Sequence, residues 1–359
     1  MCILFVLFSL SCKDKSKIQG DEKPLSKETD VFIRQIKFPV TYNLEGEVVP
    51  LDILKPTSFV VVDSFFVVGE DNAESQMFIF NRNTLELLVS LFPKGDGPDD
   101  IILMAPIYQW GKVDNELEVW INSLYKYHGA LNINKTVAQN KPVFNTKYVF
   151  NQYKKTESPI FVSNHKFALK DSSFYLSMDL SRSGSIRHNI NKNIVNYDYK
   201  TDKMSEPFYV TNYKWEKISQ LLMACDMGMR ADEAKIAVGY RYFNQLVILD
   251  MKTKSRIYIT QEPDFFTVEE AHNKQSNKSQ FYYSYVAVTD HLIFALNQKD
   301  KVNTCHFDVF DWEGKPVCQL RMPGIFYSPF IDSETKMLYV LNENFDIWSF
   351  KLDVINQAL

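Results

Sequence analysis

The sequence predicts an all-β fold: a six-bladed β-propeller of four-stranded antiparallel blades whose ring is closed by an N-terminal strand. Three observations predict it. Aromatic residues make up 14% of the 359 residues, and large rings suit the pleated, half-buried surface of a sheet. A strand–turn–strand unit recurs along the whole chain, and an alternating segment at residues 31–38 belongs to none of these units.

The first residues favour a lipoprotein-type signal segment over residues 1–12. The apolar run from Ile3 to Phe8 is too short to span a bilayer and fits a secretory h-region, although no Lys or Arg precedes it. The following "SLSC" resembles a relaxed bacterial lipobox, which makes Cys12 the expected lipid-attachment residue. An ordinary cleaved signal peptide or an apolar N-terminal arm is the alternative.

Residues 13–30 are polar and charged, as in a flexible tether between an anchor and a folded body. We expect residues 31–359 to form a single propeller domain. The expected location is the bacterial cell envelope, lipid-anchored on the periplasmic side or at the outer-membrane surface.

The repeated unit is an alternating strand, a tight turn and a second strand. Asn or Asp follows an apolar strand end in "IFNRNTLELL", "NYDYKTDKMSEPF", "ILDMKTKSRIYI" and "VFDWEGKPVCQL", and these residues tolerate the backbone angles of tight turns. The six units are residues 59–92, 117–137, 166–210, 235–260, 285–320 and 336–352.

With their connecting loops, the six units occupy about 330 residues, or roughly 55 each, more than the roughly 40–50 of a four-stranded blade. We assign the surplus to long loops at 140–165 and 262–280, with one short helix expected in "PDFFTVEEAHNKQ" (263–275). The last unit ends after its third strand, so we predict that residues 31–38 are the outermost strand of blade six. Two stacked β-sandwiches are the alternative, but no linker lies near the midpoint.

A glycine-rich corner follows the first unit, in "LFPKGDGPDDI" (91–101). Lys94, Gly95, Gly97, Pro98 and an acid at Asp99 or Asp100 match the K-G-x-G-P-x-[ED] corner of a known family. With "SLSC" and "KIAVGYRYFNQLVILD", the chain resembles the TolB-like six-bladed propeller lipoproteins of Bacteroidetes. The resemblance implies the fold and an envelope location, but no activity, because most members are uncharacterised.

We interpret this corner as a structural joint and not as a metal or anion site. It lacks the spacing and terminal Glu of an EF-hand, and no GK[ST] follows for a phosphate loop. Cys225, Cys305 and Cys318 form no CxxC and predict no zinc site; Cys305 and Cys318 are either bonded to each other or free thiols. The six His are scattered, so we expect no metal and no cofactor.

The net charge of −4, without a basic stripe, argues against a nucleic-acid partner. The candidate ligand-binding residues lie in loops beside strands: Arg182, Arg187 and His188 in blade three, and Arg230, Tyr240 and Arg241 on either side of the inner strand of blade four. Arginine beside aromatic rings binds carboxylates and sugars. The alternative is that Tyr240 and Tyr242 fill the space between blades and Arg241 is a solvated or satisfied loop residue.

The sequence therefore predicts a monomeric, non-catalytic, membrane-anchored binding or scaffold module that presents its loops to a protein or glycan. The alternative is a carbohydrate-active enzyme, a lyase or hydrolase, working at the mouth of the propeller channel. Glycoside hydrolysis requires two carboxylates placed across a cleft. Asp63, Asp226 and Asp290 are the acids expected at the ends of inner strands.

Overall fold

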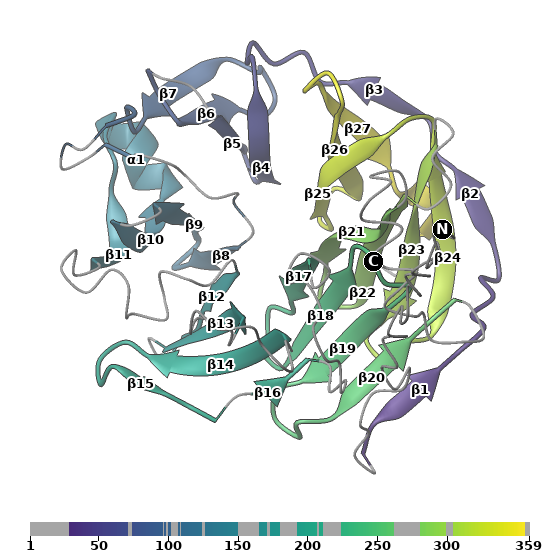
Figure 1. Ribbon diagram of the computed structural model, residues 1–359. Coiled ribbons are helices and arrows are strands. Elements are labelled where there is room, and N and C mark those ends of the chain that lie inside the picture. The colour runs from purple at the N-terminus through teal and green to yellow at the C-terminus, as the bar shows by residue number, and fades with distance from the viewer. Residues whose placement is uncertain are drawn as a thin grey trace, which may run out of the picture.

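The computed structural model describes residues 29–70, 74–95, 97, 100–101, 107, 109–123, 126–149, 165–170, 173–179, 192–206, 208–210, 224–261, 281–298 and 304–355. Six small antiparallel sheets stand as blades around a central axis (Figure 1). The predicted all-β, six-bladed propeller is confirmed.

The first three blades each run from the inside outward in chain order, apart from one extra short strand. Blade 1 contains β4 (Pro56–Val62), β5 (Phe65–Glu70), β6 (Met77–Asn81) and β7 (Leu87–Leu91). Blade 2 contains β8 (Trp110–Val113), β9 (Glu116–Ser123), β10 (Tyr127–Asn132) and β11 (Phe144–Val149). Blade 3 contains β12 (Lys166–Ala168), β13 (Ser173–Asp179), β14 (Lys192–Asp198), β15 (Lys203–Met204) and β16 (Phe208–Tyr209).

The last three blades each take up one strand from the N-terminal segment. Blade 4 contains β17 (Cys225–Met229), β18 (Lys235–Tyr240), β19 (Leu246–Asp250), β20 (Arg256–Ile259) and β1 (Val31–Ile33). Blade 5 contains β21 (Phe281–Val288), β22 (Leu292–Gln298), β23 (Cys305–Asp311), β24 (Pro316–Met322) and β2 (Thr41–Asn43). Blade 6 contains β25 (Phe326–Asp332), β26 (Met337–Asn342), β27 (Ile347–Lys351) and β3 (Gly46–Val48).

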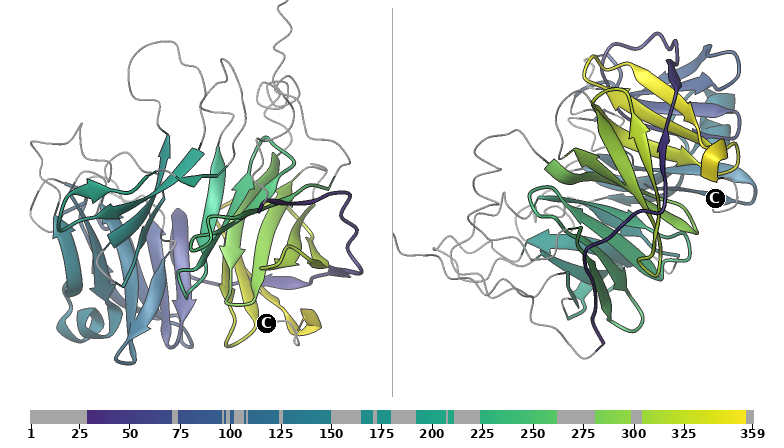
Figure 2. Two further views of the ribbon diagram at one scale, coloured as in Figure 1. Left: turned by 90° about the horizontal axis from the view of Figure 1, so that it is seen from below. Right: turned by 90° about the vertical axis from the view of Figure 1, so that its right-hand side faces the viewer.

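The two ends of the ring differ. We call the end at which the six innermost strands begin the loop face, and the opposite end, where first and second strands are joined by short turns, the turn face. Short turns and both described helices lie at the turn face (Figure 2). Binding sites of propellers are built where connections vary, which directs attention to the loop face.

Side-chain caps build the short turns that the sequence predicts. Asp250 Oδ1 accepts the backbone N–H groups of Lys252 and Thr253 at 2.9 and 2.8 Å, and Lys254 then adopts a left-handed φ of 58°. Asn81 and Asp198 cap their turns in the same way, and Asp311 accepts the N–H groups of Glu313 and Lys315, two and four positions ahead. This explains why Asn or Asp follows each of these strand ends.

The core consists of apolar layers between neighbouring blades. Side chains alternate along a strand, and a middle strand of a blade has a blade on each side, so both of its faces are buried. The strand β18 shows the result: Ile236 to Tyr240 are all buried. This is why the predicted units contain continuous apolar runs.

The N-terminal strap, residues 30–48, crosses the outside of three blades (Figure 2, right). Its strand β1 pairs in parallel with β20 and β2 pairs in parallel with β24, whereas β3 pairs antiparallel with β27 as the fourth strand of blade 6. An N-terminal strand therefore closes the ring, but the prediction that residues 31–38 do so is wrong. An alternating edge strand does not specify in its own sequence which edge it joins.

Other boundaries also differ from the prediction. The innermost strands β8, β17 and β25 precede the units predicted from residues 117, 235 and 336, and residues 144–149 form β11 inside a predicted loop. The helix α1 (Ile133–Gln139) is a single short element that shows no periodicity. Asn132 caps its first turn and Asn140, with φ of 50°, ends it. The helix expected at 263–275 lies outside the described residues.

Candidate functional site

A guanidinium group lies at the loop face beside the innermost strands of blades 4 and 5. Arg241 directly follows β18, and its backbone is bonded on both sides: its N–H donates to Ala224 O and its carbonyl accepts from Tyr282 N–H, both at 2.9 Å. The guanidinium carbon lies 5.3 Å from the centre of the Phe281 ring. Among the residues that the structure describes, this guanidinium forms no hydrogen bond or ion pair.

Aromatic rings extend this position across blades 4 to 6. Tyr242 meets Phe281 edge-on at 5.8 Å, and Tyr285 lies 6.4 Å from Tyr327 on the innermost strand of blade 6. Burial raises the pKa of the Tyr285 hydroxyl, and the nearby Arg241 charge opposes that rise. These rings are partly exposed. Together with Arg241, they place apolar ring faces beside a cation at the loop-face end of the channel.

A carboxylate and an imidazole complete the polar part of the site. Asp226, the second residue of β17, lies with Oδ1 3.1 Å from Nε2 of His165, and its Oδ2 accepts the N–H of Val286 at 2.7 Å. Asp226 thus links the innermost strands of blades 4 and 5 to His165, which directly precedes the innermost strand of blade 3. Both oxygens of Asp226 are therefore hydrogen-bonded, which fixes the carboxylate in one orientation.

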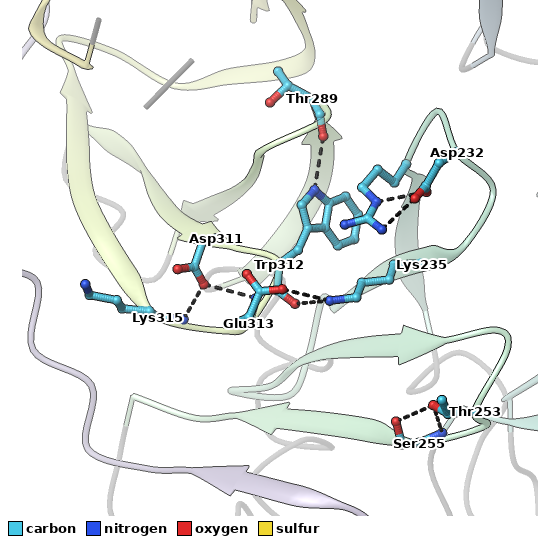
Figure 3. A network of polar contacts seen from close by, with 10 residues as sticks. Asp232, Lys235, Thr253, Ser255, Thr289, Asp311, Trp312, Glu313 and Lys315 are labelled. Carbon is cyan, nitrogen blue, oxygen red and sulfur yellow. Dashed lines mark hydrogen bonds and ion pairs between the residues drawn. The ribbon is translucent and has the colours of Figure 1, made fainter. Parts of the chain in front are cut away.

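The two predicted arginines of blade four lie at opposite ends of it. Arg230 follows β17 at the turn face, where Asp232 accepts from its Nε and Nη2 at 2.8 and 2.6 Å and the Trp312 ring lies 5.5 Å away. Lys235, Trp312 and Glu313 form the adjoining network in Figure 3. A six-residue strand, about 20 Å long, separates Arg230 from Arg241.

One of the other predicted residues is buried, and the rest lie outside the residues that the structure describes. Tyr240 is fully buried against Phe243, with ring centres 5.6 Å apart, so its ring packs between blades. Arg182, Arg187, His188 and Cys12 lie outside the residues that the structure describes.

The three acids expected at inner-strand ends do not meet. Asp226 lies at the loop face, whereas Asp63 and Asp290 lie in turns at the turn face. Asp63 pairs there with Lys112 at 2.7 Å. These three residues therefore provide no pair of carboxylates across a cleft, which is the arrangement that glycoside hydrolysis needs.

The glycine-rich corner is filled by a side chain of blade 2. The Lys126 ammonium donates to the carbonyls of Gly95, Gly97 and Asp100 at 3.1, 3.0 and 3.0 Å. Asp100 Oδ2 accepts the N–H of Gly97 at 2.9 Å, and a Cβ on Gly95 would lie 2.4 Å from that same oxygen. The described part of the corner is therefore a joint between blades 1 and 2; Asp96, Pro98 and Asp99 lie outside the described residues.

Cys225, Cys305 and Cys318 take part in no disulfide. Cys305 pairs with Met322 and Cys318 with Val309 across β23 and β24, so the two thiols are four positions apart in register. Burial raises the pKa of each of these two thiols to about 12. Within the described ranges, no group of three or more His, Cys, Asp or Glu side chains is placed to hold a metal ion.

None of the helices in the described ranges is long and apolar enough to cross a membrane.

Sequence reasoning named Asp226 and Arg241 but missed the residues that surround them. His165 directly precedes the innermost strand β12, Phe281 is the first residue of the innermost strand β21, and Tyr285 lies further along β21. The aromatic run "FYYSY" at 281–285 is the signal that marks this place in the sequence. It is informative only once residue 281 is known to begin an innermost strand.

Two solved structures show the same architecture. A member of the DUF4221 family from Bacteroides vulgatus ATCC 8482 superposes with a TM-score of 0.53 at 12% identity, covering 86% of this chain and 97% of its own. A protein of Bacteroides fragilis NCTC 9343, named as a candidate exported protein, superposes with a TM-score of 0.52 at 12% identity, covering 90% and 99%. No protein-family model and no curated protein matches the sequence. Likeness at this identity shows the fold alone.

Proposed function

We propose that this chain is an exported, non-catalytic binding propeller whose ligand is an acidic glycan. The observation that carries the proposal is the half-buried guanidinium of Arg241, which stacks on Phe281 at the loop face without an acidic partner among the described residues. The other arginines with described partners are bonded to carboxylates: Arg82 to Asp332, Arg230 to Asp232, and Arg256 to Asp30.

A uronic acid fits this arrangement better than a neutral sugar. Its carboxylate can take two parallel hydrogen bonds from a guanidinium, while the faces of sugar rings pack on aromatic side chains such as Tyr285 and Tyr327. Asp226 and His165 supply hydrogen-bonding atoms for hydroxyl groups nearby. Because both oxygens of the Asp226 carboxylate are already hydrogen-bonded, Asp226 suits a binding role better than the role of a proton donor.

Export is the second part of the proposal. It is supported by the signal-like first residues, by the polar stretch before the strap, and by the name of the Bacteroides fragilis neighbour. Lipid attachment at Cys12 and membership of the TolB-like propeller family are also predictions. Mass spectrometry of the membrane fraction would find Cys12 diacylated at the new N-terminus; an unmodified chain that keeps residues 1–11 would exclude the anchor.

Calorimetric titration tests the ligand. We expect a galacturonic-acid tetramer to bind at least tenfold more tightly than the neutral galactose tetramer. Arg241→Gln should lose roughly tenfold to a hundredfold in affinity, the usual effect of removing hydrogen bonds to a charged group.

Arg230→Gln is the matched control, because it removes an arginine that also faces an aromatic ring, but at the turn face. Equal binding of the two tetramers, or an Arg241→Gln variant that binds like wild type, would refute the proposal. A tetraglutamate peptide that binds more tightly than the acidic sugar would indicate a protein partner. Release of unsaturated or shortened sugars during the titration would instead support the carbohydrate-active enzyme.

A further inference from the structure

The innermost strand of blade 2 carries an exposed tryptophan. Trp110, the first residue of β8, is 37% exposed, whereas Trp312 is buried. All four residues of β8 are at least partly exposed, in contrast to the three buried residues of β12 in blade 3. A Cβ on Gly111 would meet no heavy atom within 4 Å. Solvent therefore reaches the wall of the ring at β8.

The Trp110 ring extends past blade 1 to blade 6. Its centre lies 6.0 Å from that of Phe330 on the innermost strand β25, and the two ring planes are tilted by 51°. Blade 1 stands between blades 2 and 6 in the ring (Figure 1), so the two rings meet on the channel side of β4. Phe330 is buried and supports one part of the indole, while the exposed part faces the channel.

Three charged groups lie beside this indole, toward the turn face. Lys112 is two residues after Trp110, so its side chain leaves the same face of β8, about 7 Å further along the strand. Its ammonium lies 2.7 Å from Asp63 of blade 1 and 3.0 Å from Glu334 of blade 6. These hydrogen bonds raise the pKa of Lys112, so the ammonium stays protonated. The cluster then has one negative charge in excess.

This arrangement defines the class of ligand that fits. The excess carboxylate would repel an anion, and the position between the two carboxylates that a cation would take is already filled by Lys112. A sugar hydroxyl both donates to carboxylates and accepts from ammonium groups, and an ammonium has three N–H donors, of which Lys112 uses two on the described carboxylates. The C–H face of a pyranose ring packs on an indole. A neutral sugar combines the two kinds of group.

We propose that Trp110 and Lys112, together with Asp63 and Glu334, form a binding site for a neutral pyranose sugar at the turn-face end of the channel. The site is separate from the one around Arg241 at the loop face and does not depend on the function proposed above. The sugar ring would cover the exposed indole, and burial of that apolar surface stabilises the complex.

Calorimetric titration of the full chain with cellotetraose tests the proposal. This probe is neutral, and its β-linked glucose units carry their hydroxyls equatorially, so both faces of each ring present C–H groups. We expect cellotetraose to bind, and Trp110→Ala to weaken the affinity at least about tenfold. Lys112→Met should weaken it about threefold to tenfold, the usual effect of losing one hydrogen bond. Arg241→Gln should leave it unchanged, which separates this site from the one at the loop face.

Phe345→Ala is the matched control. Phe345 is 40% exposed, a fraction close to that of Trp110, but it lies in the turn between β26 and β27 at the loop face. This variant should bind cellotetraose like the wild type. If Trp110→Ala does not fold, Trp110→Phe replaces it, because a smaller ring can still pack on Phe330; we expect it to bind several times more weakly than the wild type.

Two results would overturn the proposal. Absence of binding up to about 10 mM cellotetraose, or binding that the Trp110 variants leave unchanged, would show that the exposed indole holds no sugar. A glucosamine tetramer that binds more tightly than cellotetraose would show that Asp63 and Glu334 recruit a cation, and the ligand would then not be neutral.

Discussion

Arg256 and Asp30 form a buried, two-pronged ion pair across 226 positions of sequence. Arg256 Nε lies 3.1 Å from Oδ1 of Asp30 and Nη2 lies 2.7 Å from Oδ2, and the two side chains are 2% and 0% exposed. Nη1 also donates to the carbonyl of Tyr209 at 3.2 Å. One guanidinium thus joins the N-terminal strap to blades 3 and 4, and the stacked rings of Phe32 and Tyr258 lie beside it.

Removal of Asp30 should be strongly destabilising. Asp30→Ala leaves a buried guanidinium without its counter-charge, and we expect a loss of about 3–5 kcal/mol in the free energy of unfolding, measured in urea. Asp232→Ala is the control, since it breaks a pair of the same geometry in which Asp232 is 54% exposed; its loss should stay below about 1 kcal/mol. Equal, small losses would show that the strap is not held by this pair.

Gly239 should not tolerate a side chain. A Cβ there would lie 2.7 Å from Cγ2 of Val286 and 2.8 Å from Cβ of Tyr283, where blade 4 packs on blade 5. We expect Gly239→Ala to cost about 1–3 kcal/mol of stability through overpacking. Gly111→Ala, with no heavy atom within 4 Å of its Cβ, should be neutral. A neutral Gly239→Ala would mean that the two blades separate without cost.

The corner bonded by Lys126 should behave as a joint and not as a metal site. Lys126→Met removes the donor shared by three carbonyls, and we expect a loss of about 1–3 kcal/mol. The control Lys135→Met, which breaks a surface pair with Glu116, should cost less than about 1 kcal/mol. Calcium at 5 mM should leave the Tm of the wild type unchanged. Calcium-dependent stabilisation of the wild type that is lost in Asp100→Asn would contradict this view.

The buried thiols should resist alkylation. With the pKa of Cys305 and Cys318 raised to about 12, very little thiolate exists at pH 8. We expect iodoacetamide to label both at least about a thousandfold more slowly than an exposed cysteine. Half-buried Cys225 should react before them. Peptide mass spectrometry resolves each site, and urea-unfolded protein is the control; equal rates for Cys225 and Cys305 in the native protein would contradict their burial.

Acid should destabilise the fold through His128. Burial lowers its pKa to about 3 in the folded chain against about 6.5 in an unfolded one, so the unfolded state binds the extra proton as the pH falls below 6.5. Each pH unit between 6.5 and 3 should then cost about 1.4 kcal/mol. The difference in unfolding free energy between His128→Phe and wild type should therefore shift by about 3 kcal/mol between pH 7 and 4. Parallel pH profiles would exclude the effect.

Most of the fold was predictable because blade turns carry local chemistry. Asp250 and Asn81 cap their turns by bonds to residues two and three positions ahead, so the pattern is visible in any short window. The short helix α1 was missed because seven residues are too few to show the 3.6-residue spacing of apolar side chains that marks a helix. The innermost strands of blades 2, 4 and 6 were missed because they are short or interrupted by polar residues, as in "CDMGM".

The candidate site was predictable only in part. Arg241 was named from its neighbours Tyr240 and Tyr242, yet Tyr240 is buried and the ring under the guanidinium is Phe281. Arg230 was grouped with Arg241, although a whole strand separates them. Grouping by sequence distance fails here, because a six-residue strand moves the chain from one face of the ring to the other.

The sequence alone determined the number of blades, the turn chemistry and the presence of an N-terminal strand that closes the ring. These features follow from alternation and from side-chain caps, which act over a few residues. Only the tertiary structure decided that the strap crosses three blades before closing the ring, that Asp30 meets Arg256, and that Trp110 and Lys112 of blade 2 reach residues of blade 6. Each of these depends on strands meeting across blade boundaries, and no local pattern encodes which edge or face a strand will meet.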